Sequence, residues 1–172
     1  MFENIEINIS ELPKLSSDSF VPLEKNYRTV ILLKAIILST LVTAAFVLFY
    51  MNKSSKIPDL IWTIIFIALV IFVLSNILIA YLGFKKKKYK LRQYDIVYKT
   101  GLLWRSETSI PFVRVQHSEV IQGPIERLFR LSKLKLYTAG GHSSDLSVPG
   151  LSLTKAEQLK DFITKRIQEE VE

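Results

Sequence analysis

Residues 60–88 read LIWTIIFIALVIFVLSNILIAYLGFKKKK, and this stretch determines how the rest of the chain is organised. The part from Leu60 to Phe84 carries no charge, and as a helix it would extend about 37 Å, more than the roughly 30 Å hydrocarbon core of a bilayer. We therefore expect a transmembrane helix. The lysines at 85–88 follow at once, and lysine clusters beside membrane helices mark the cytoplasmic side. The remainder of the chain is therefore expected in the cytoplasm.

A second apolar block precedes this helix, from Val30 to Met51, and only Lys34 interrupts it. A lysine within about one turn of a helix end extends its ammonium to the lipid headgroups, so this block also predicts a spanning helix. The short connection from Asn52 to Asp59 allows only a tight hairpin between antiparallel helices. Lys and Arg are more numerous on the flanks beside the chain termini than in this connection. That bias predicts a multi-pass protein of the bacterial plasma membrane with both termini in the cytoplasm.

The charge is distributed unevenly along the chain. The 172 residues carry a net charge of +7, but the positive excess lies within 25–92, whereas residues 93–172 are close to balance. A basic excess beside membrane helices favours contact with anionic membrane lipids and argues against nucleic-acid binding. The chain contains no cysteine, which excludes disulfides and thiolate chemistry.

Residues 1–24 are polar and acidic and lack the features of a signal peptide, so we expect a cytoplasmic N-terminal tail. Its segment from Phe2 to Leu12 has isoleucine at every second position from Ile5 to Ile9, which is typical of a half-buried strand. A flexible tail with chance alternation explains the pattern equally well. Residues 13–22 are expected to form a linker.

Beyond the lysines the hydrophobic pattern changes from continuous runs to short alternating stretches, which predicts β-sheet. The parity of the apolar residues slips near Ser118-Glu119, which indicates a bulge. The proline after Gly123 suits the first turn of a short helix. The expected strands lie at about 96–99, 102–110, 113–122, 134–138 and 147–148, and the short helix at 125–129.

The chain closes with an amphipathic helix expected from about Lys155 to Glu170. Thr154 and Glu157 have the spacing of a capping box. Apolar residues recur at intervals of three and four, so one face of this helix must be covered. Strands followed by one amphipathic helix give a curved sheet or partial barrel, with the helix closing one end. The apolar stripe consists of Ala156, Leu159, Ile163 and Ile167.

The two histidines are the obvious candidates for chemistry. His117 has the strand parity of Val113, so we expect it to lie against the core rather than to act as a ligand or catalyst. His142 precedes Ser143 and Asp145 in one turn, but a catalytic triad is assembled in space with an oxyanion hole. Two histidines without a carboxylate at ligand spacing do not make a metal site. We therefore expect no enzyme, and neither a catalytic residue, a metal, a cofactor nor a small-molecule substrate.

Four ordered motifs carry a resemblance to a known family. They are Ile110-Pro111-x-x-Arg114-Val115-Gln116-His117, Ile125-Glu126-Arg127-Leu128-Phe129, Leu136-Tyr137-Thr138-Ala139-Gly140-Gly141 and Val148-Pro149-Gly150-Leu151. Across about residues 85–170 the chain resembles the bacterial pleckstrin-homology (PH) family 2, also called the YdbS-like membrane family. The resemblance implies a PH-like barrel capped by the C-terminal helix. It also implies a non-enzymatic membrane protein, often accompanied by a larger relative with repeated copies of the domain.

Two positions within these motifs carry separate expectations. Arg130 stands where a glycine is expected to end the short helix, so the local turn there is expected to differ. Arg114 on a sheet face is expected to pair with a neighbouring carboxylate such as Glu126. We favour an architectural role over ligand binding for the residues that match the family motifs, namely Arg114, Gln116, His117, Arg127, Thr138, Gly140 and Gly141.

These observations together predict a membrane α-helical hairpin at 25–84, with spans at about 30–51 and 60–84, followed by a mainly-β PH-like barrel with a C-terminal helical cap at 85–172. The expected function is a non-catalytic membrane-tethered module for protein–protein interaction or assembly, as a homo-oligomer or with a larger PH-domain relative. Binding of anionic lipid headgroups is the alternative, and an accessory subunit of a transporter or enzyme comes third. The candidate lipid contacts are Lys85, Lys86, Lys87, Lys88, Lys90 and Arg92.

Overall fold

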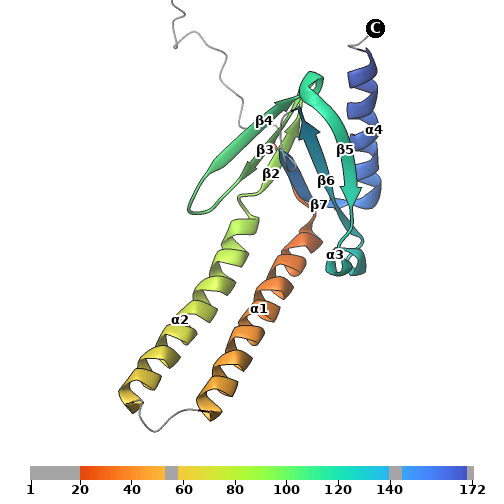
Figure 1. The fold of residues 1–172 in the computed structure, drawn as a ribbon. Coiled ribbons are helices and arrows are strands. Elements are labelled where there is room, and N and C mark those ends of the chain that lie inside the picture. The colour runs from red at the N-terminus through yellow and green to blue at the C-terminus, as the bar shows by residue number, and fades with distance from the viewer. Residues whose placement is uncertain (1–19, 53–57, 140–144, 170–172) are drawn as a thin grey trace, which may run out of the picture.

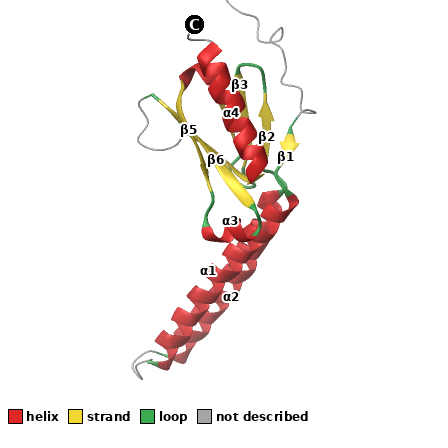
Figure 2. Cartoon of the chain, turned by 90° about the vertical axis from the view of Figure 1, so that its right-hand side faces the viewer, coloured by secondary structure: helices red, strands yellow, loops and turns green. Residues whose placement is uncertain are grey.

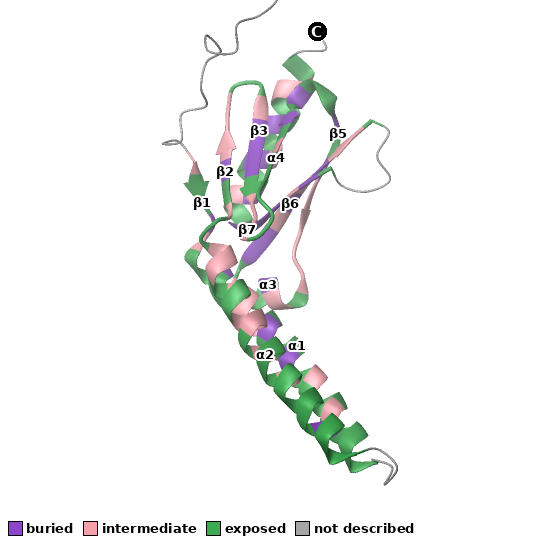
Figure 3. Ribbon diagram, turned by 90° about the vertical axis from the view of Figure 1, so that its left-hand side faces the viewer, coloured by how far each residue is buried: buried purple, intermediate pink, exposed green. Residues whose placement is uncertain are grey.

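The computed structural model describes residues 20–52, 58–139 and 145–169. Two antiparallel helices, α1 (Lys25–Met51) and α2 (Asp59–Phe84), form a hairpin, and a domain of strands lies at one end of it (Figure 1). Both helices are long and apolar enough to cross a membrane, as the sequence predicted. Their surfaces are exposed along most of their length (Figure 3), and Trp62 is the only buried residue of α2.

The strands form two antiparallel sheets. The first has the order β1 (Val21–Pro22), β2 (Lys88–Leu91), β3 (Asp95–Thr100) and β4 (Ser106–Pro111). The second has the order β5 (Val115–Ile121), β6 (Leu131–Thr138) and β7 (Leu146–Ser152). Within the described ranges no strand pairing joins the two sheets. The predicted PH-like architecture is therefore present, but its sheets are not closed into a true barrel.

Two short elements and a long one complete the domain. A 3-10 turn, η3 (Phe112–Arg114), links the two sheets, and the short helix α3 (Pro124–Leu128) follows β5. The C-terminal helix α4 (Leu153–Glu169) packs on the second sheet, while α3 lies between this sheet and the hairpin (Figure 2). The amphipathic pattern of α4 is confirmed, since Ala156, Leu159 and Ile163 are buried.

The strand predicted at 102–110 begins only at Ser106. The reason is Gly101, which has a φ of +106° and starts a tight turn. A Cβ at this position would lie 1.6 Å from the carbonyl oxygen of Trp104. Only glycine fits such a close backbone approach, so the four residues after it form a turn instead of a strand.

The capping box predicted for the last helix is wrong. Because α4 begins at Leu153, Thr154 already lies within the helix. Ser152 takes the capping role instead: its Oγ accepts a hydrogen bond from the N–H of Lys155 at 3.3 Å.

The hydrophobic core includes residues from the start of the described chain. Residues Val21–Pro22, within the predicted linker, pair with β2. Leu23 and, on the first turns of α1, Tyr27 and Val30 are buried in the same cluster as the strands. The first turns of α1 therefore belong to the core of the domain as well as to the hairpin. The remaining core residues are Tyr89, Ile96, Tyr98, Ile110, Phe112, Val115, Leu131, Leu134, Leu136, Leu146, Val148, Leu151, Ala156, Leu159 and Ile163.

Candidate functional site

The domain is fixed directly on α1 through a glycine in β7. Gly150 has a φ of +66°, and a Cβ built there would lie 2.4 Å from the ring of Tyr27. The N–H of Glu24 donates a hydrogen bond to the Gly150 carbonyl at 3.0 Å, and the Glu24 carboxylate lies 3.7 Å from the ammonium of Lys155. Close backbone approach at one glycine thus joins the second sheet, α4 and the start of the first membrane helix.

An ion pair makes a second connection between the helix and the domain. The ammonium of Lys34, on α1, lies 2.6 Å from the Glu126 carboxylate on α3, whose side chain is only 9% exposed. Burial alone would raise the pKa of the Glu126 carboxyl, but the hydrogen bond from Lys34 and a backbone hydrogen bond hold that pKa below its usual value. Lys34 therefore faces the domain as well as the lipid headgroups predicted for it. Glu126 pairs with Lys34, and not with Arg114 as expected from the sequence.

The predicted lipid-contacting cations lie around the junction of α2 and β2. Lys85, Lys86 and Lys88 are exposed, in or next to the turn that leaves α2. The ammonium of Lys85 lies 5.2 Å from the ring centre of Tyr81, one turn earlier on the same helix. These three lysines are free to meet an anionic surface.

The other three predicted cations have partners within the domain. The half-buried Lys87 extends its ammonium over the ring of Tyr27, 5.7 Å from its centre. The ammonium of Lys90, on β2, lies 5.9 Å from the ring centre of Phe20, and Arg92 forms an ion pair and two hydrogen bonds with the carboxylate of Asp95. The six cations therefore lie in the turn after α2, on β2 and in the turn that follows β2.

Hydrophobic side chains are exposed where the domain adjoins the hairpin. The turn after β3 presents Leu103 and Trp104, which are 75% and 88% exposed, beside the end of α2 (Figure 1). On α3, beside α1, Leu128 is 80% exposed. Leu103 and Trp104 were not predicted as a site, because residues 102–110 were predicted to form a strand. The signal was present, since three consecutive apolar residues after Gly101 break the alternation of a strand.

A groove of about 490 Å³ lies between β5, which is an edge strand of the second sheet, and the start of α4. Among the described strands β5 pairs with β6 alone, so its other edge has backbone N–H and C=O groups without a strand partner. The groove contains polar, charged and apolar groups together. Its lining residues are His117, Ser118, Glu119, Val120, Gln122, Leu153, Glu157 and Lys160.

Three of the family-motif residues lie where η3 leads into β5. Arg114, Gln116 and His117 are all exposed. The prediction that His117 lies against the core is wrong, because the register of β5 against β6 shifts just before it, and the bulge is there rather than near Ser118. Ser118 is buried in its place, while the His117 ring lies 5.7 Å from that of Tyr137.

The other motif residues lie apart from this edge. Arg127 is exposed on α3, and the Thr138 hydroxyl donates a hydrogen bond to the Asp145 carboxylate at 2.7 Å. Arg130 has a φ of +55°, the left-handed conformation that the missing glycine would adopt. Gly140, Gly141 and His142 lie outside the described residues. No group of three or more His, Cys, Asp or Glu that could hold a metal occurs in the described part of the chain.

The chain has a small PH-like domain with two open sheets and a helical cap, and this domain packs closely on the first of two apolar helices. These features are those of a membrane-anchored PH-like protein. The family model described as "Bacterial PH domain" matches residues 29–167, so this chain belongs to that family. The resemblance inferred from the four motifs is thereby confirmed. The match includes most of the first helix, in keeping with the contribution of α1 to the core of the domain.

The chain is similar to the UPF0699 transmembrane protein YdbS of Bacillus subtilis (strain 168), with 30% identity over 78 residues. That stretch covers 45% of this chain and 47% of the relative, so the match spans about half of the relative's length. No solved structure gives a significant match to this chain. Similarity to a transmembrane protein and the two apolar helices together make this a membrane protein.

Proposed function

We propose that this protein is a non-catalytic module, held at the membrane by α1 and α2, that binds a protein partner along the free edge of β5. The observation that carries the proposal is the groove between this edge and α4. An unpaired strand edge beside a helix accepts an extended segment as an additional strand, with main-chain hydrogen bonds for affinity and adjacent pockets for side-chain selection.

The exposed motif residues support a surface role for this edge. Gln116 and His117 extend into solvent at the start of β5, and Glu157 is exposed on the facing turn of α4. The packing of the domain on α1 supports the proposal further, because this packing holds the groove in one orientation relative to the membrane. Confinement beside a membrane raises the effective concentration of neighbouring domains, so a short strand suffices for assembly.

The partner we propose is a second copy of this chain, which contributes its segment from Phe2 to Leu12. Isoleucine at every second position from Ile5 to Ile9 gives that segment one apolar face, as an added strand requires. A larger PH-domain relative with a comparable strand is the other partner that fits the same groove.

Site-directed photocrosslinking in native membranes tests the proposal. A benzoylphenylalanine replaces Glu157 in the groove or, as the matched control, Glu107 on the outer strand β4. We expect crosslinked species from position 157 in at least several-fold excess over position 107, with mass spectrometry locating the attachment within residues 2–12 or in a relative. Deletion of residues 1–19 is expected to remove the crosslink between copies.

The opposite results are equally clear. Equal crosslinking from positions 157 and 107 would reject the groove as the binding surface. A strictly monomeric protein mass, net of detergent, by light scattering, together with no crosslinked protein, would reject the interaction module. Lipid sensing through Lys85, Lys86 and Lys88 would then be the better function, because these exposed lysines border the membrane end of the domain.

We also propose that both termini lie in the cytoplasm, since the lysines at 85–88 flank the end of α2 nearest the domain. Single cysteines at Ser54→Cys and Ser143→Cys in this cysteine-free chain test the orientation. A reagent that cannot cross the membrane should label position 54 in intact cells and position 143 only after lysis. Labelling of position 143 in intact cells, with position 54 silent, would reverse the topology.

A further inference from the structure

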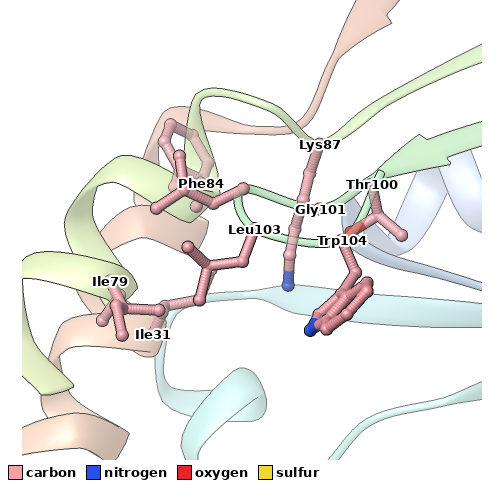
Figure 4. A pocket seen from close by; sticks show the side chains of 11 residues that line it. Ile31, Ile79, Phe84, Lys87, Thr100, Gly101, Leu103 and Trp104 are labelled. Carbon is pink, nitrogen blue, oxygen red and sulfur yellow. The ribbon is translucent and has the colours of Figure 1, made fainter. Parts of the chain in front are cut away.

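A cavity of about 340 Å³ lies between the helical hairpin and the turn after β3 (Figure 4). One wall comes from the membrane helices, through Ile31, Ile79 and Phe84, and the opposite wall from Leu103. In Figure 4 the side chain of Leu103 extends toward Ile79 and Ile31. The cavity therefore opens between an apolar turn of the domain and the helix surfaces that face lipid.

One cation lies at the boundary of this apolar cavity. The half-buried side chain of Lys87 lines it, and no carboxylate of the described residues lies within ion-pair distance of the Lys87 ammonium. Burial lowers the pKa of the Lys87 ammonium, and the positive charges of Lys133 and Lys34 lower it further. An anionic group beside this ammonium would relieve both effects.

The side chains of the turn have the character of residues at a membrane interface. Trp104 combines a large apolar ring system with one N–H donor, and such side chains concentrate at the depth of the lipid headgroups. Leu103 and Trp104 are adjacent, large and apolar, and adjacent exposed side chains of this kind mark interaction sites with proteins or membranes. Beside the ends of α1 and α2, these two side chains are placed where lipid would surround them.

We propose that this cavity binds one phospholipid from the leaflet next to the domain, with the lipid phosphate on the ammonium of Lys87 and an acyl chain between Ile79 and Leu103. Trp104 then lies among the headgroups. The combination of one half-buried cation with apolar walls selects a lipid phosphate over free phosphate, which has no apolar part to place. The inference requires only that α1 and α2 span the membrane, and it is independent of the protein partner proposed for β5.

The depth of the turn is measured with Trp104 as the only tryptophan. The chain has two tryptophans, so Trp62→Phe leaves Trp104 alone as the fluorescent reporter. In nanodiscs of the full chain we expect blue-shifted emission that phospholipids brominated on the acyl chains quench strongly and aqueous iodide quenches weakly. Water-like emission with the reverse order of quenching would overturn the proposal.

Bound lipid is measured separately, by native mass spectrometry of the full chain extracted from membranes. Lys87→Gln is compared with Lys86→Gln, which removes the same charge from the exposed neighbour. We expect one retained phospholipid per chain in the wild type and in Lys86→Gln, and at least a fivefold lower occupancy in Lys87→Gln. Lys87→Arg, which keeps the cation, should retain the lipid.

Three outcomes of the second experiment would reject the site. Equal losses in Lys86→Gln and Lys87→Gln would indicate diffuse attraction to an anionic surface. Absence of retained lipid in the wild type would show that the cavity holds none. Displacement of the bound species by millimolar inorganic phosphate would identify a soluble anion instead of a lipid. Unchanged crosslinking from position 157 in Lys87→Gln would separate a failure of this site from a failure of the β5 interface.

Discussion

The hairpin and the β-domain bury the same kinds of residue in opposite ways. Ile71 on α2 is 62% exposed in the isolated chain, whereas Ile163 on α4 is fully buried. In the domain, water forces apolar side chains into one core. Along the hairpin the surrounding lipid takes the place of that core. The two helices therefore need to contact each other only along a narrow strip of side chains. Burial by protein therefore identifies the residues that form the core of the domain. It says little about the stability of the membrane helices, whose apolar side chains are covered by lipid.

The two regions meet at the first turns of α1, where the rules of both apply. Tyr27 and Val30 are buried by protein, although they lie in the same continuous helix as exposed residues such as Leu41. This junction is the seam between the domain and its anchor, and a substitution there should weaken the core to which Tyr27 and Val30 belong as well as the attachment to α1. The predictions below test the core, the seam and its charges in that order.

The largest effect is expected from a charge in the core of the domain. Ile163→Asp should destabilise the domain by roughly 4 kcal/mol or more, because an unpaired carboxylate would be buried in a structure whose total stability is about 5–15 kcal/mol. Gln158→Asp, on the exposed face of the same helix, is the control and should change the melting temperature little. Thermal unfolding of the full chain in micelles, followed by protease digestion, measures both. A wild-type melting temperature for Ile163→Asp would mean that α4 does not cover the core.

The seam is tested by adding a single methyl group. Gly150→Ala should cost about 2–4 kcal/mol, since the left-handed backbone is unfavourable for alanine by about 1–2 kcal/mol and the new Cβ also overlaps the ring of Tyr27. Gly83→Ala is the matched control, because nothing lies within 4 Å of a Cβ at that position. Hydrogen exchange should show faster exchange in β7 and at the start of α1 for Gly150→Ala only. Equal exchange in the two variants would mean that the domain is not seated on Tyr27.

The ion pair across the seam should respond asymmetrically to the loss of either partner. Lys34→Met leaves the Glu126 carboxylate buried without its cation and should cost about 2–3 kcal/mol, whereas Glu126→Gln leaves a half-exposed lysine that can turn to the headgroups and should cost about 1 kcal/mol. The double variant should be more stable than Lys34→Met alone. Equal costs for the two single variants would show that the pair is solvated.

The sequence predicted the elements but not their junction, and the reasons are physical. The hairpin and α4 followed from continuous apolar runs and from a stripe of period 3.6, both local patterns. The bulge was predicted near Ser118 but lies before His117, so the parity argument assigned His117 to the wrong side of β5. Lys34 and Glu126 are far apart in sequence, so no local pattern pairs them. The same limit applied to the cavity, which combines α1, α2 and a turn that alternation had assigned to a strand.

The smallest effect is expected from acid, and its sign follows from the carboxyl groups of Glu126 and Asp95. Burial opposes ionisation of Glu126 and Asp95, but the hydrogen bond from Lys34 holds the pKa of Glu126 below its usual value, and hydrogen bonds from Arg92 and Ser109 do the same for the pKa of Asp95. A lowered folded-state pKa stabilises the fold above the unfolded-state value, and this contribution disappears as the pH falls through the folded-state pKa. Stability should therefore stay level from neutral pH to about 5 and decline below about 4.5. Glu126→Gln has already lost its titrating group, so its stability should decline less steeply over the same interval than that of the wild type. Melting temperatures of both proteins between pH 3 and 7 measure the difference, and parallel curves would show that Glu126 is not coupled to Lys34.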